Sequence, residues 1–519
     1  MTFSASHCFR YSRLSTFVKL MAVAPLYLLS QQAFSAVIVD GGIGSGKLDV
    51  GPGTAAQEYI ARNNATLNVT TGAVVKRLQA TTGSTLNVTA ATVTSADSTQ
   101  PAISLSNSTA TISNAQVTSH NNGGLNVARQ VDTTTGSYAQ VNSSGITGAT
   151  YGANVTSHSV LELNNSVLTG KSREGLRLLG GSAIATGSEI TGATSGVRMG
   201  RDTLTASESP HLTLDGSRVI GLNGPAINVD GPITAEIDIL NGSTLNGQNG
   251  NMLELTGGGN ANMRVNNSAL AGNIQVGAGS ALDLSLDGAF MNGDVINTGG
   301  NASVGLNNGA ILTGRLENVD KLAINSDATW VMVDHQQVGD LSLSGGNVKF
   351  GETGTFYQLD VANLSGNGTF IMSADFATLT GDFLNVTGTS SGDHKLLIAS
   401  SGADPLSDDR LHVVHTADGG AQFSLIGDRV DVGTYSYSLI NENAGQDWLL
   451  DPDSKVISPS TNSVLALFNA APTVLLGEMT TLRTRMGELR FSEGQSAGFW
   501  TRAYGNKYEV SNDKTGLGY

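Results

Sequence analysis

Apolar and polar residues alternate with period two through much of the chain. The alternation recurs in short stretches such as Leu125-Asn126-Val127 and Leu253-Glu254-Leu255. Period two is typical of a β-strand with one buried face, whereas an amphipathic helix would place its apolar residues three and four apart. The pattern therefore predicts many short strands, each with one face in a core.

A longer repeat sets the spacing of these strands. From Asn142 to Gly314 a polar turn, a few mostly apolar residues and a glycine recur, as in SSGITG ending at Gly148 and NNSVLTG ending at Gly170. The closing glycines follow one another at steps of 22, 22, 29, 26, 25, 21 and 21 residues. A period of this length is typical of a solenoid. We therefore predict an all-β fold in which residues 37–380 form a right-handed parallel β-helix.

Stacking of the coils in register would align the polar middle residues of these strands in a column on the outer surface. Neighbouring asparagines in such a column can exchange amide hydrogen bonds, whereas Arg177 above Arg198 places like charges together. The predicted column contains Asn126, Asn154, Arg177, Arg198, Asn228 and Glu254.

Basic residues near this column form a candidate binding patch on an otherwise acidic protein. The patch consists of Lys171, Arg173, Arg177, Arg198 and Arg201. It would contact a glycan or another anionic surface. The alternative is that the two arginines of the column are solvated and cover apolar surface with their stems.

Composition and charge restrict the class of partner. The formal net charge of −15 argues against nucleic acid, because binding to phosphates needs clustered lysine and arginine. We expect no nucleic-acid partner and a monomeric protein.

The first 36 residues have the pattern of a secretory signal peptide. A basic segment that ends at Lys19 precedes an apolar run from Leu20 to Leu29, and small residues follow up to Ala36. We place the cleavage after Ala36, with cleavage after Ser35 as the alternative. The single cysteine, Cys8, precedes the apolar run, so the chain after cleavage would have no disulfide.

The region from residue 320 onward resembles a known family. The stretches GDFLNVTGTSSGDHKLLIASSG and VDVGTYSYSL are similar to the carboxyl-terminal passenger region of pertactin-type autotransporters. The resemblance implies that residues 381–457 form an autochaperone-like folding core, a β-sandwich-like cap on the last coils. Dense alternation in LHVVH, QFSLI and VDVGTYSYSLI independently predicts antiparallel hairpin strands, with a tight turn at residues 417–420. The predicted folding core contains Phe383, Leu384, Val386, Leu396, Ile398, Val432, Gly433 and Tyr435.

Large aromatic residues become frequent at strand positions from Trp330 onward. Since burial of one such side chain contributes on the order of 2 kcal/mol, this end of the solenoid should be the more stable one. We therefore predict that residues 320–457 fold alone and template the coils toward the amino terminus.

Residues 458–491 follow a helical periodicity. Apolar residues recur at three and four spacings, which predicts a helix with Thr461 or Asn462 as its cap and a break or kink at Pro472. By the resemblance this is the linker helix, and residues 492–519 begin an outer-membrane β-barrel that is truncated here. We expect that the sequence is a fragment or that the gene is broken, because one strand cannot sit in lipid without a closed barrel.

Three groups of residues could carry catalysis, and each has a simpler explanation. Residues 388–392, GTSSG, match the GxSxG pattern, but strands flank them on both sides, whereas a nucleophile elbow joins a strand to a helix. Two other groups combine carboxylates with basic residues, as enzymes that act on polysaccharide do. They are Asp334, His335 and Asp340, and Asp404, Asp408, Asp409 and Arg410. We interpret both as solvated loops and expect no catalytic residue, cofactor or metal site.

These observations predict a non-enzymatic autotransporter passenger that acts in adhesion. It would be displayed on the outer membrane of a Gram-negative bacterium, or released after processing. Its partners would be the outer membrane, through the barrel, and an unidentified glycan or protein receptor on a host surface. The alternative is a secreted β-helix enzyme, a lyase or hydrolase of polysaccharide.

Overall fold

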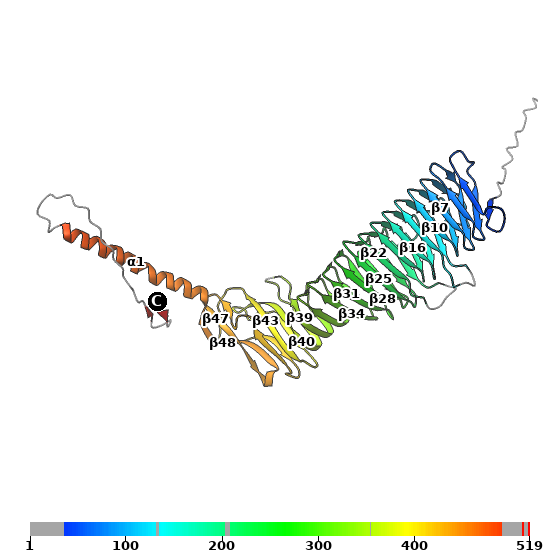
Figure 1. Cartoon of the computed structure of the whole chain (residues 1–519). Helices are drawn as coiled ribbons and strands as arrows, with labels where there is room; N and C mark the ends of the chain where they lie inside the picture. The colour runs from blue at the N-terminus through cyan, green and yellow to red at the C-terminus, as the bar shows by residue number, and fades with distance from the viewer. Residues whose placement is uncertain are drawn as a thin grey trace, which may run out of the picture. The chain divides into compact units, whose positions relative to one another are not determined.

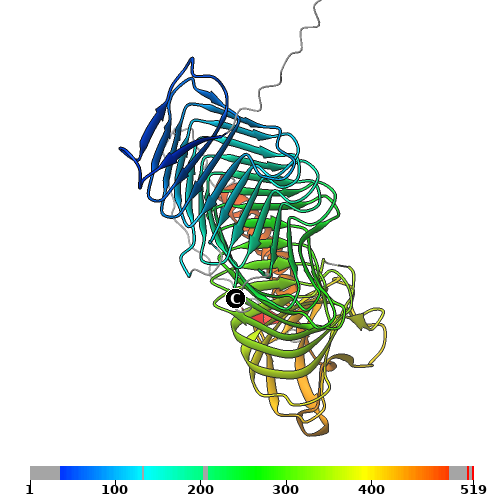
Figure 2. The ribbon, with the colours of Figure 1, turned by 90° about the vertical axis from the view of Figure 1, so that its right-hand side faces the viewer.

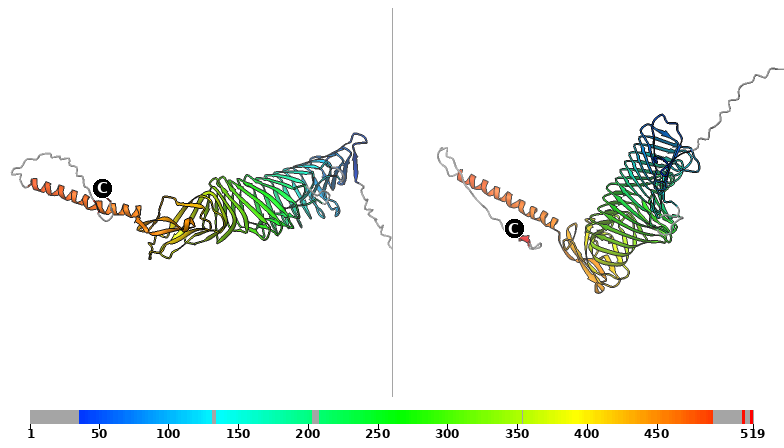
Figure 3. Two further views of the ribbon diagram at one scale, coloured as in Figure 1. Left: turned by 90° about the horizontal axis from the view of Figure 1, so that it is seen from below. Right: turned by 45° about the vertical axis from the view of Figure 1, so that its right-hand side comes forward.

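The computed structural model describes residues 36–130, 134–202, 208–352, 354–489, 511–512 and 517–518. Short strands stack coil upon coil through the solenoid (Figure 1). The same stack is visible after rotation about the vertical axis (Figure 2) and about the horizontal axis (Figure 3). The predicted signal peptide lies outside the described residues up to Ser35, so its cleavage stays a prediction.

The coils contribute strands to three parallel sheets, here called sheets A, B and C. Sheet A has 13 strands: β1 (Val37–Asp40), β3 (Glu58–Arg62), β6 (Arg77–Thr81), β9 (Ile103–Ser106), β12 (Leu125–Ala128), β15 (Ala153–Thr156), β18 (Leu176–Leu179), β21 (Val197–Gly200), β24 (Ile227–Asp230), β27 (Asn251–Thr256), β30 (Asn273–Val276), β33 (Val295–Asn297) and β36 (Leu316–Glu317). Sheet C has eight: β5 (Val74–Val75), β8 (Thr92–Ser95), β11 (Gln116–Ser119), β14 (Gly145–Gly148), β17 (Val167–Gly170), β20 (Glu189–Gly192), β23 (Arg218–Gly221) and β26 (Thr244–Gly247).

Sheet B begins at the amino terminus and continues into the carboxyl-terminal region. Its solenoid strands are β2 (Lys47–Val50), β4 (Thr66–Val69), β7 (Thr85–Thr89), β10 (Thr109–Ser113), β13 (Tyr138–Asn142), β16 (Val160–Asn164), β19 (Ser182–Thr186), β22 (His211–Asp215), β25 (Thr234–Leu240), β28 (Asn260–Asn266), β31 (Ala281–Asp287), β34 (Asn301–Asn307), β37 (Val319–Asn325) and β39 (Gln336–Lys349). A shorter series joins it at β39: β29 (Ala269–Ala271), β32 (Phe290–Asn292), β35 (Ile311–Thr313) and β38 (Thr329–Val331).

This strand order confirms the predicted parallel β-solenoid. In the middle of the stack each strand pairs with the strand three places on in the chain, as β12 pairs with β15, and the ladder is parallel. The handedness of the coil stays a prediction. The alternation has the expected cause, because Leu125 and Val127 are buried while Asn126 between them faces outward.

Buried serines explain the polar residue of the repeat phrase. At the turns into the sheet C strands from β14 to β23, the backbone N–H of one serine donates to the hydroxyl of the equivalent serine in the next coil. The distances are 3.2 Å from Ser144 to Ser166 and 3.0 Å from Ser166 to Ser188. Ser217 and Ser243 continue the ladder. Each hydroxyl therefore satisfies a backbone donor that the corner leaves without a sheet partner.

Close backbone approach explains the closing glycines. At the end of the sheet C strand a Cβ on Gly148 would lie 1.9 Å from the carbonyl oxygen of Tyr151, and one on Gly192 would lie 1.9 Å from that of Ser195. Gly170, Gly221 and Gly247 meet the same obstacle. A side chain cannot be accommodated at this corner, so each of these coils has a glycine there.

The carboxyl-terminal region extends the stack before its strands reverse. Its strands are β40 (Gln358–Asp375), β41 (Thr380–Gly381), β42 (Phe383–Val386), β43 (Gly392–Ser400), β44 (Leu411–Thr416), β45 (Ala421–Leu425), β46 (Val430–Val432), β47 (Tyr435–Glu442) and β48 (Asp447–Ile457), with a 3₁₀ turn at Asn443–Gly445. β44 runs parallel to β42, and β45 runs parallel to β43. β48 is antiparallel to both β44 and β47, and β46 is antiparallel to β47.

The predicted hairpin between LHVVH and QFSLI is therefore wrong. These segments are β44 and β45, and each pairs with the preceding coil rather than with the other. Alternation cannot distinguish the two arrangements, because both bury every second residue. In place of the expected β-sandwich-like cap, the parallel coils continue through β45. Antiparallel pairing occurs among β44, β46, β47 and β48, and in the short β40–β41 ladder.

Most residues of the predicted folding core are buried. Leu384, Val386, Leu396, Ile398 and Val432 lie in the continuous core. The others differ. Phe383 is half-buried on the outer face, where its ring meets His412 edge-on at 5.0 Å between centroids. Gly433 forms the turn between β46 and β47 with a φ of 51°, and Tyr435 is half-buried beneath Lys455.

Helix α1 (Pro459–Leu489) lies within the predicted residues 458–491 and begins before both predicted cap residues. The cap is Ser458, whose hydroxyl accepts the backbone N–H of Thr461 at 3.3 Å, in place of Thr461 or Asn462. Pro at the first helical position fits this start. The helix continues through Pro472, so the proline does not end it. Among the residues described, no helix has both the length and the apolar character needed to cross a membrane.

The predicted first barrel strand lies mostly outside the described residues. Within residues 492–519 the structure describes only β49 (Ser511–Asn512) and β50 (Leu517–Gly518), which pair antiparallel. The barrel therefore stays an implication of the family resemblance.

One buried carboxyl group makes stability depend on pH. Asp382 accepts the backbone N–H groups of Tyr357 at 2.7 Å and Ser373 at 2.6 Å. Burial nevertheless raises the pKa of Asp382 from 3.8 to about 6. Between these values the folded state holds a proton that the unfolded state has lost. The contribution of Asp382 to stability is therefore fully present below pH 4 and is lost as the pH rises through 6.

We expect this effect to amount to about 1–2 kcal/mol between pH 4 and pH 7, allowing for residual solvation of the carboxylate. The measurement is the urea unfolding free energy of the wild type and of Asp382→Asn at both pH values. The difference between the two proteins should change by that amount in favour of the wild type at low pH. Asp408→Asn, which removes one carboxylate from an exposed loop, is the control for the change in net charge. A difference for Asp382→Asn that does not change with pH would contradict the assignment.

Candidate functional surface on sheet A

The predicted column on sheet A is present in register. Asn126 is opposite Asn154, Asn154 opposite Arg177, and Arg177 opposite Arg198. The column continues through Asn228 and Glu254. Because parallel strands are about 4.8 Å apart, these side chains form a closely spaced polar row on one outer face.

At its amino-terminal end the column contains the expected hydrogen bond between neighbouring asparagine side chains. Asn154 Nδ2 donates to Asn126 Oδ1 at 2.8 Å. This side-chain bond links β12 to β15 across the outer face and supports their register, whereas Asn154 Oδ1 is buried and accepts no hydrogen bond from the residues described.

Arg177 is held by an acidic and an aromatic neighbour. Its Nη2 lies 3.2 Å from Oε2 of Glu174, a buried residue in the turn before β18, and its guanidinium lies 5.1 Å from the ring centroid of Tyr151. The Arg177 side chain is only 16% exposed. These contacts offset the repulsion from Arg198, and they leave Arg177 little free surface.

Arg198 has its own carboxylate partner. Its Nη2 donates to Asp230 Oδ2 at 2.7 Å, from the neighbouring strand β24. Each arginine of the pair is therefore matched by its own carboxylate, Arg177 by Glu174 and Arg198 by Asp230, so the surface is not the uniformly basic one that the sequence suggested. The arginine stems also cover the sheet, as in the alternative interpretation.

The remaining residues of the predicted patch lie in the connecting turns. Lys171 and Arg173 are exposed in the turn between β17 and β18, and the Arg173 side chain is 54% exposed with its Nε 3.8 Å from Glu174. Arg201 is exposed directly after β21. Arg173 and Arg198 thus offer more accessible charge than Arg177 does.

The GxSxG segment is a structural turn. Ser390 is buried, and its hydroxyl donates to Asp418 Oδ1 at 2.5 Å and accepts the backbone N–H of Ala421 at 3.0 Å. His394 does not face this serine: it is buried between Phe370 and Phe423, and its Nε2 contacts the carbonyl oxygen of Ser391. The hydroxyl cross-links two coils through Asp418, and among the residues described it has no histidine partner.

In both acidic groups named in the sequence analysis, the residues are engaged by local contacts. His335 Nδ1 accepts the backbone N–H of Gln358 at 2.9 Å and its ring packs against Tyr357. Asp340 accepts the Asn363 amide. In the second group Arg410 pairs with Glu442 and Asp451, whereas Asp408 is an exposed loop residue. Neither group presents two free carboxylates to one point of a cleft.

A family comparison identifies the carboxyl-terminal part of the solenoid. Residues 338–452, from β39 into β48, match the family described as Pertactin. This segment is a pertactin-family autotransporter passenger region. Autotransporters of Gram-negative bacteria are surface-displayed or secreted proteins.

Three relatives of the passenger are also autotransporters. Autotransporter CRAC of Citrobacter rodentium is 34% identical over 40% of this chain and 15% of its own length. The BrkA autotransporter of Bordetella pertussis is 27% identical over 66% of this chain and 34% of its own length. The autotransporter adhesin/invasin TibA of Escherichia coli is 33% identical over 38% of this chain and 22% of its own length. The alignments thus span at most about a third of these relatives.

Several residues that shape the passenger's surface are not evident in the sequence. Glu174, Asp230 and Tyr151 set the charge balance of the arginine pair, and only the strand register brings them together. A second omission is the cluster of His412, His415 and Asp447. The spacing of the two histidines in LHVVH was its visible signal, but the carboxylate is more than 30 residues away in the chain.

Proposed function

We propose that the passenger is a non-enzymatic adhesin displayed on, or released from, the surface of a Gram-negative bacterium. The observation that carries the proposal is the continuous polar row on sheet A of a chain whose family is surface-displayed or secreted. The similarity to TibA, an adhesin/invasin, supports the same role. The receptor would be a glycan or protein of a host or other surface.

Sheet A offers a physical basis for contact with an anionic glycan. Arginine recognises carboxylate and sulfate groups through paired N–H donors. An exposed arginine can make these contacts without giving up a buried carboxylate partner. Arg198, with its side chain 31% exposed, and the exposed Arg173 are placed to make them. Neighbouring asparagines and Tyr151 add hydrogen bonds and an aromatic face of the kind that sugar rings contact.

For the rival function, hydrolysis or lysis of polysaccharide, the candidate residues named in the sequence analysis are engaged in other contacts. His335 is engaged by a backbone N–H, and Ser390 by Asp418. General acid–base catalysis needs groups within hydrogen-bond reach of one substrate position. These contacts support the non-enzymatic proposal.

We expect Arg173→Ser combined with Arg198→Ser to weaken binding to a sulfated glycan about threefold to tenfold at low salt, since each exposed charge contact contributes up to about 1 kcal/mol. The effect should fade at high salt, because the Debye length falls from about 10 Å at 0.1 M to about 3 Å at 1 M. The measurement is surface plasmon resonance on immobilised heparin at both ionic strengths.

The matched control is Arg218→Ser combined with Arg264→Ser. These arginines are 53% and 61% exposed and lie on sheets C and B, so the control removes the same net charge from other faces. It should leave most of the binding intact. Equal losses in both double variants would mean that only net charge matters, and unchanged binding in both would remove sheet A from the proposal.

A further inference from the structure

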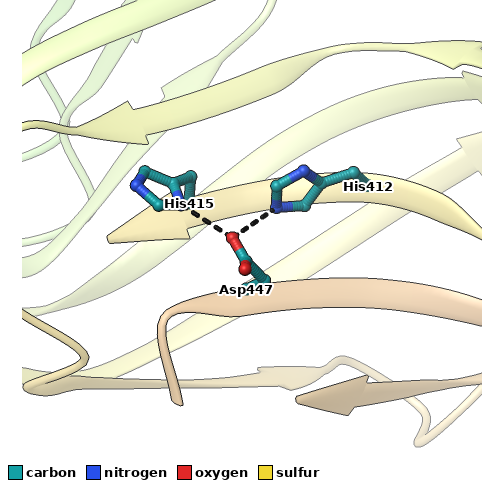
Figure 4. A group of neighbouring side chains, drawn as sticks. All are labelled: His412, His415 and Asp447. Carbon is teal, nitrogen blue, oxygen red and sulfur yellow. Dashed lines mark hydrogen bonds and ion pairs between the residues drawn. The ribbon is translucent and has the colours of Figure 1, made fainter. Parts of the chain in front are cut away.

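A cluster of two imidazoles and one carboxylate lies on the outer side of the carboxyl-terminal region. Asp447 Oδ1 is 2.7 Å from His415 Nδ1 and 3.2 Å from His412 Nε2. Figure 4 shows both rings, which come from β44, directed toward this carboxylate on β48. The three candidate ligand atoms all lie within 4.8 Å of one another.

A β-bulge is responsible for the arrangement. Residues three apart on a regular strand face opposite sides, so His412 and His415 would be separated by the sheet. The pairing of β44 with β48 shifts register between His412 and Val414, and both Val413 and Val414 are buried. The extra inward residue returns both histidines to the outer face. Bulges commonly redirect side chains at functional sites.

The strand pairing places the carboxylate beside them. Asp447 begins β48 and is the antiparallel partner of His415. Its second oxygen, Oδ2, accepts the Asn443 side-chain amide, which orients the carboxylate and leaves Oδ1 directed at the rings. The histidine side chains are 38% and 36% exposed, so an ion can reach the site from solvent.

The distances suit a transition-metal ion. Zinc binds imidazole nitrogen at about 2.0–2.1 Å and carboxylate oxygen at about 2.0–2.2 Å, so neighbouring ligand atoms in a tetrahedral site are about 3.3 Å apart. The two nitrogen–oxygen separations in the cluster are 2.7 Å and 3.2 Å. His412 Nε2 also lies 2.9 Å from the carbonyl oxygen of Val414, and ligation of an ion replaces that contact.

We propose that His412, His415 and Asp447 bind a divalent transition-metal ion of the Zn²⁺ class. Imidazole ligands favour zinc, copper, nickel and cobalt over magnesium and calcium, which prefer oxygen. Three protein ligands leave a position for water, as in open zinc sites. The ion fastens β48 to β44, where the chain changes from parallel coils to antiparallel pairing.

Such a clip stabilises the folded carboxyl-terminal region, because a ligand that binds only the folded state shifts unfolding by mass action. The unfolded chain separates His415 from Asp447 by 32 residues, so it does not present the site preformed. The bound ion also keeps one coordination position open to solvent, next to Phe383 on the outer face of sheet B.

The test is isothermal titration of Zn²⁺ into the metal-stripped chain without residues 1–36. We expect one bound ion per chain, with at least tenfold weaker binding in each of His412→Ala, His415→Ala and Asp447→Asn. Asp447→Asn retains the shape and an acceptor oxygen, so it tests ligation with minimal disturbance of the fold. Circular dichroism of every variant checks that the strands are intact. Mg²⁺ should not compete.

His211→Ala is the matched control. His211 is also a strand histidine beside a carboxylate, with Nε2 2.9 Å from Asp238, but it lies outside the three-residue cluster. This variant should bind Zn²⁺ as the wild type does. Absence of binding to the wild type, or wild-type binding by Asp447→Asn and by the His412→Ala and His415→Ala double variant, would overturn the proposal.

Discussion

Replacing Phe370 with alanine is expected to lower the free energy of unfolding by about 3–5 kcal/mol. Phe370 lies on β40 and is fully buried. Its ring centroid is 6.4 Å from that of Phe423 and 5.7 Å from that of His394, and Phe423 in turn contacts Trp448 at 5.5 Å. Truncation removes the centre of this cluster and leaves a cavity that the surrounding ladders cannot close.

The matched control is the same substitution at Phe290, which is 54% exposed on β32 of the same solenoid. Phe290→Ala should change the unfolding free energy by no more than about 0.5 kcal/mol. Urea unfolding followed by far-ultraviolet circular dichroism gives both values. Equal changes in the unfolding free energy for the two substitutions would show that the buried aromatic cluster contributes no more to stability than one exposed phenylalanine.

Deleting residues 381–457 is expected to slow refolding of the upstream coils at least tenfold. In a solenoid each coil gains stability from its neighbours, so folding starts in the most stable part and propagates. Large buried aromatic residues are concentrated in the predicted folding unit, residues 320–457, where Phe376 stacks on Tyr437 at 5.1 Å and Phe423 contacts Trp448. The deletion also leaves the strand edge of β40 without the partners that β42 and β43 provide.

The control is deletion of residues 37–113, which removes the first coils and equally exposes a strand edge at the other end. It should leave the refolding rate of the remaining coils nearly unchanged. Stopped-flow dilution from denaturant gives the rates, and limited proteolysis in moderate denaturant should yield a resistant fragment within residues 320–457. A resistant fragment at residues 140–314, or equal rates for the two deletions, would contradict the folding-core prediction.

The sequence was sufficient to predict the solenoid because its repeat has direct physical causes. The closing glycines are required where a Cβ would meet a carbonyl oxygen, as at Gly148, and the serines before them satisfy a buried backbone donor, as at Ser166. These needs recur once per coil. Because the register follows from the repeat, the column from Asn126 to Glu254 could be predicted from the sequence alone.

Features that depend on contacts between distant residues could not be predicted in this way. Parallel continuation through β45 and an antiparallel hairpin give the same alternation, so the pattern could not choose between them. The neutralisation of Arg177 and Arg198 depends on Glu174 and Asp230, which no local motif marks. The metal cluster depends on a bulge at Val413, and two adjacent apolar residues within a strand are a weak sign of one.

The most direct test of the account is a quartz crystal microbalance measurement of the chain flowing over films of sulfated and neutral glycans. An adhesin should add mass that saturates and then stays constant, with no reducing ends or unsaturated sugars released. The gain should be smaller for the Arg173→Ser and Arg198→Ser double variant than for the Arg218→Ser and Arg264→Ser control. Progressive loss of film mass with release of sugar products, abolished by Asp334→Asn or His335→Ala, would contradict the account and establish the passenger as an enzyme.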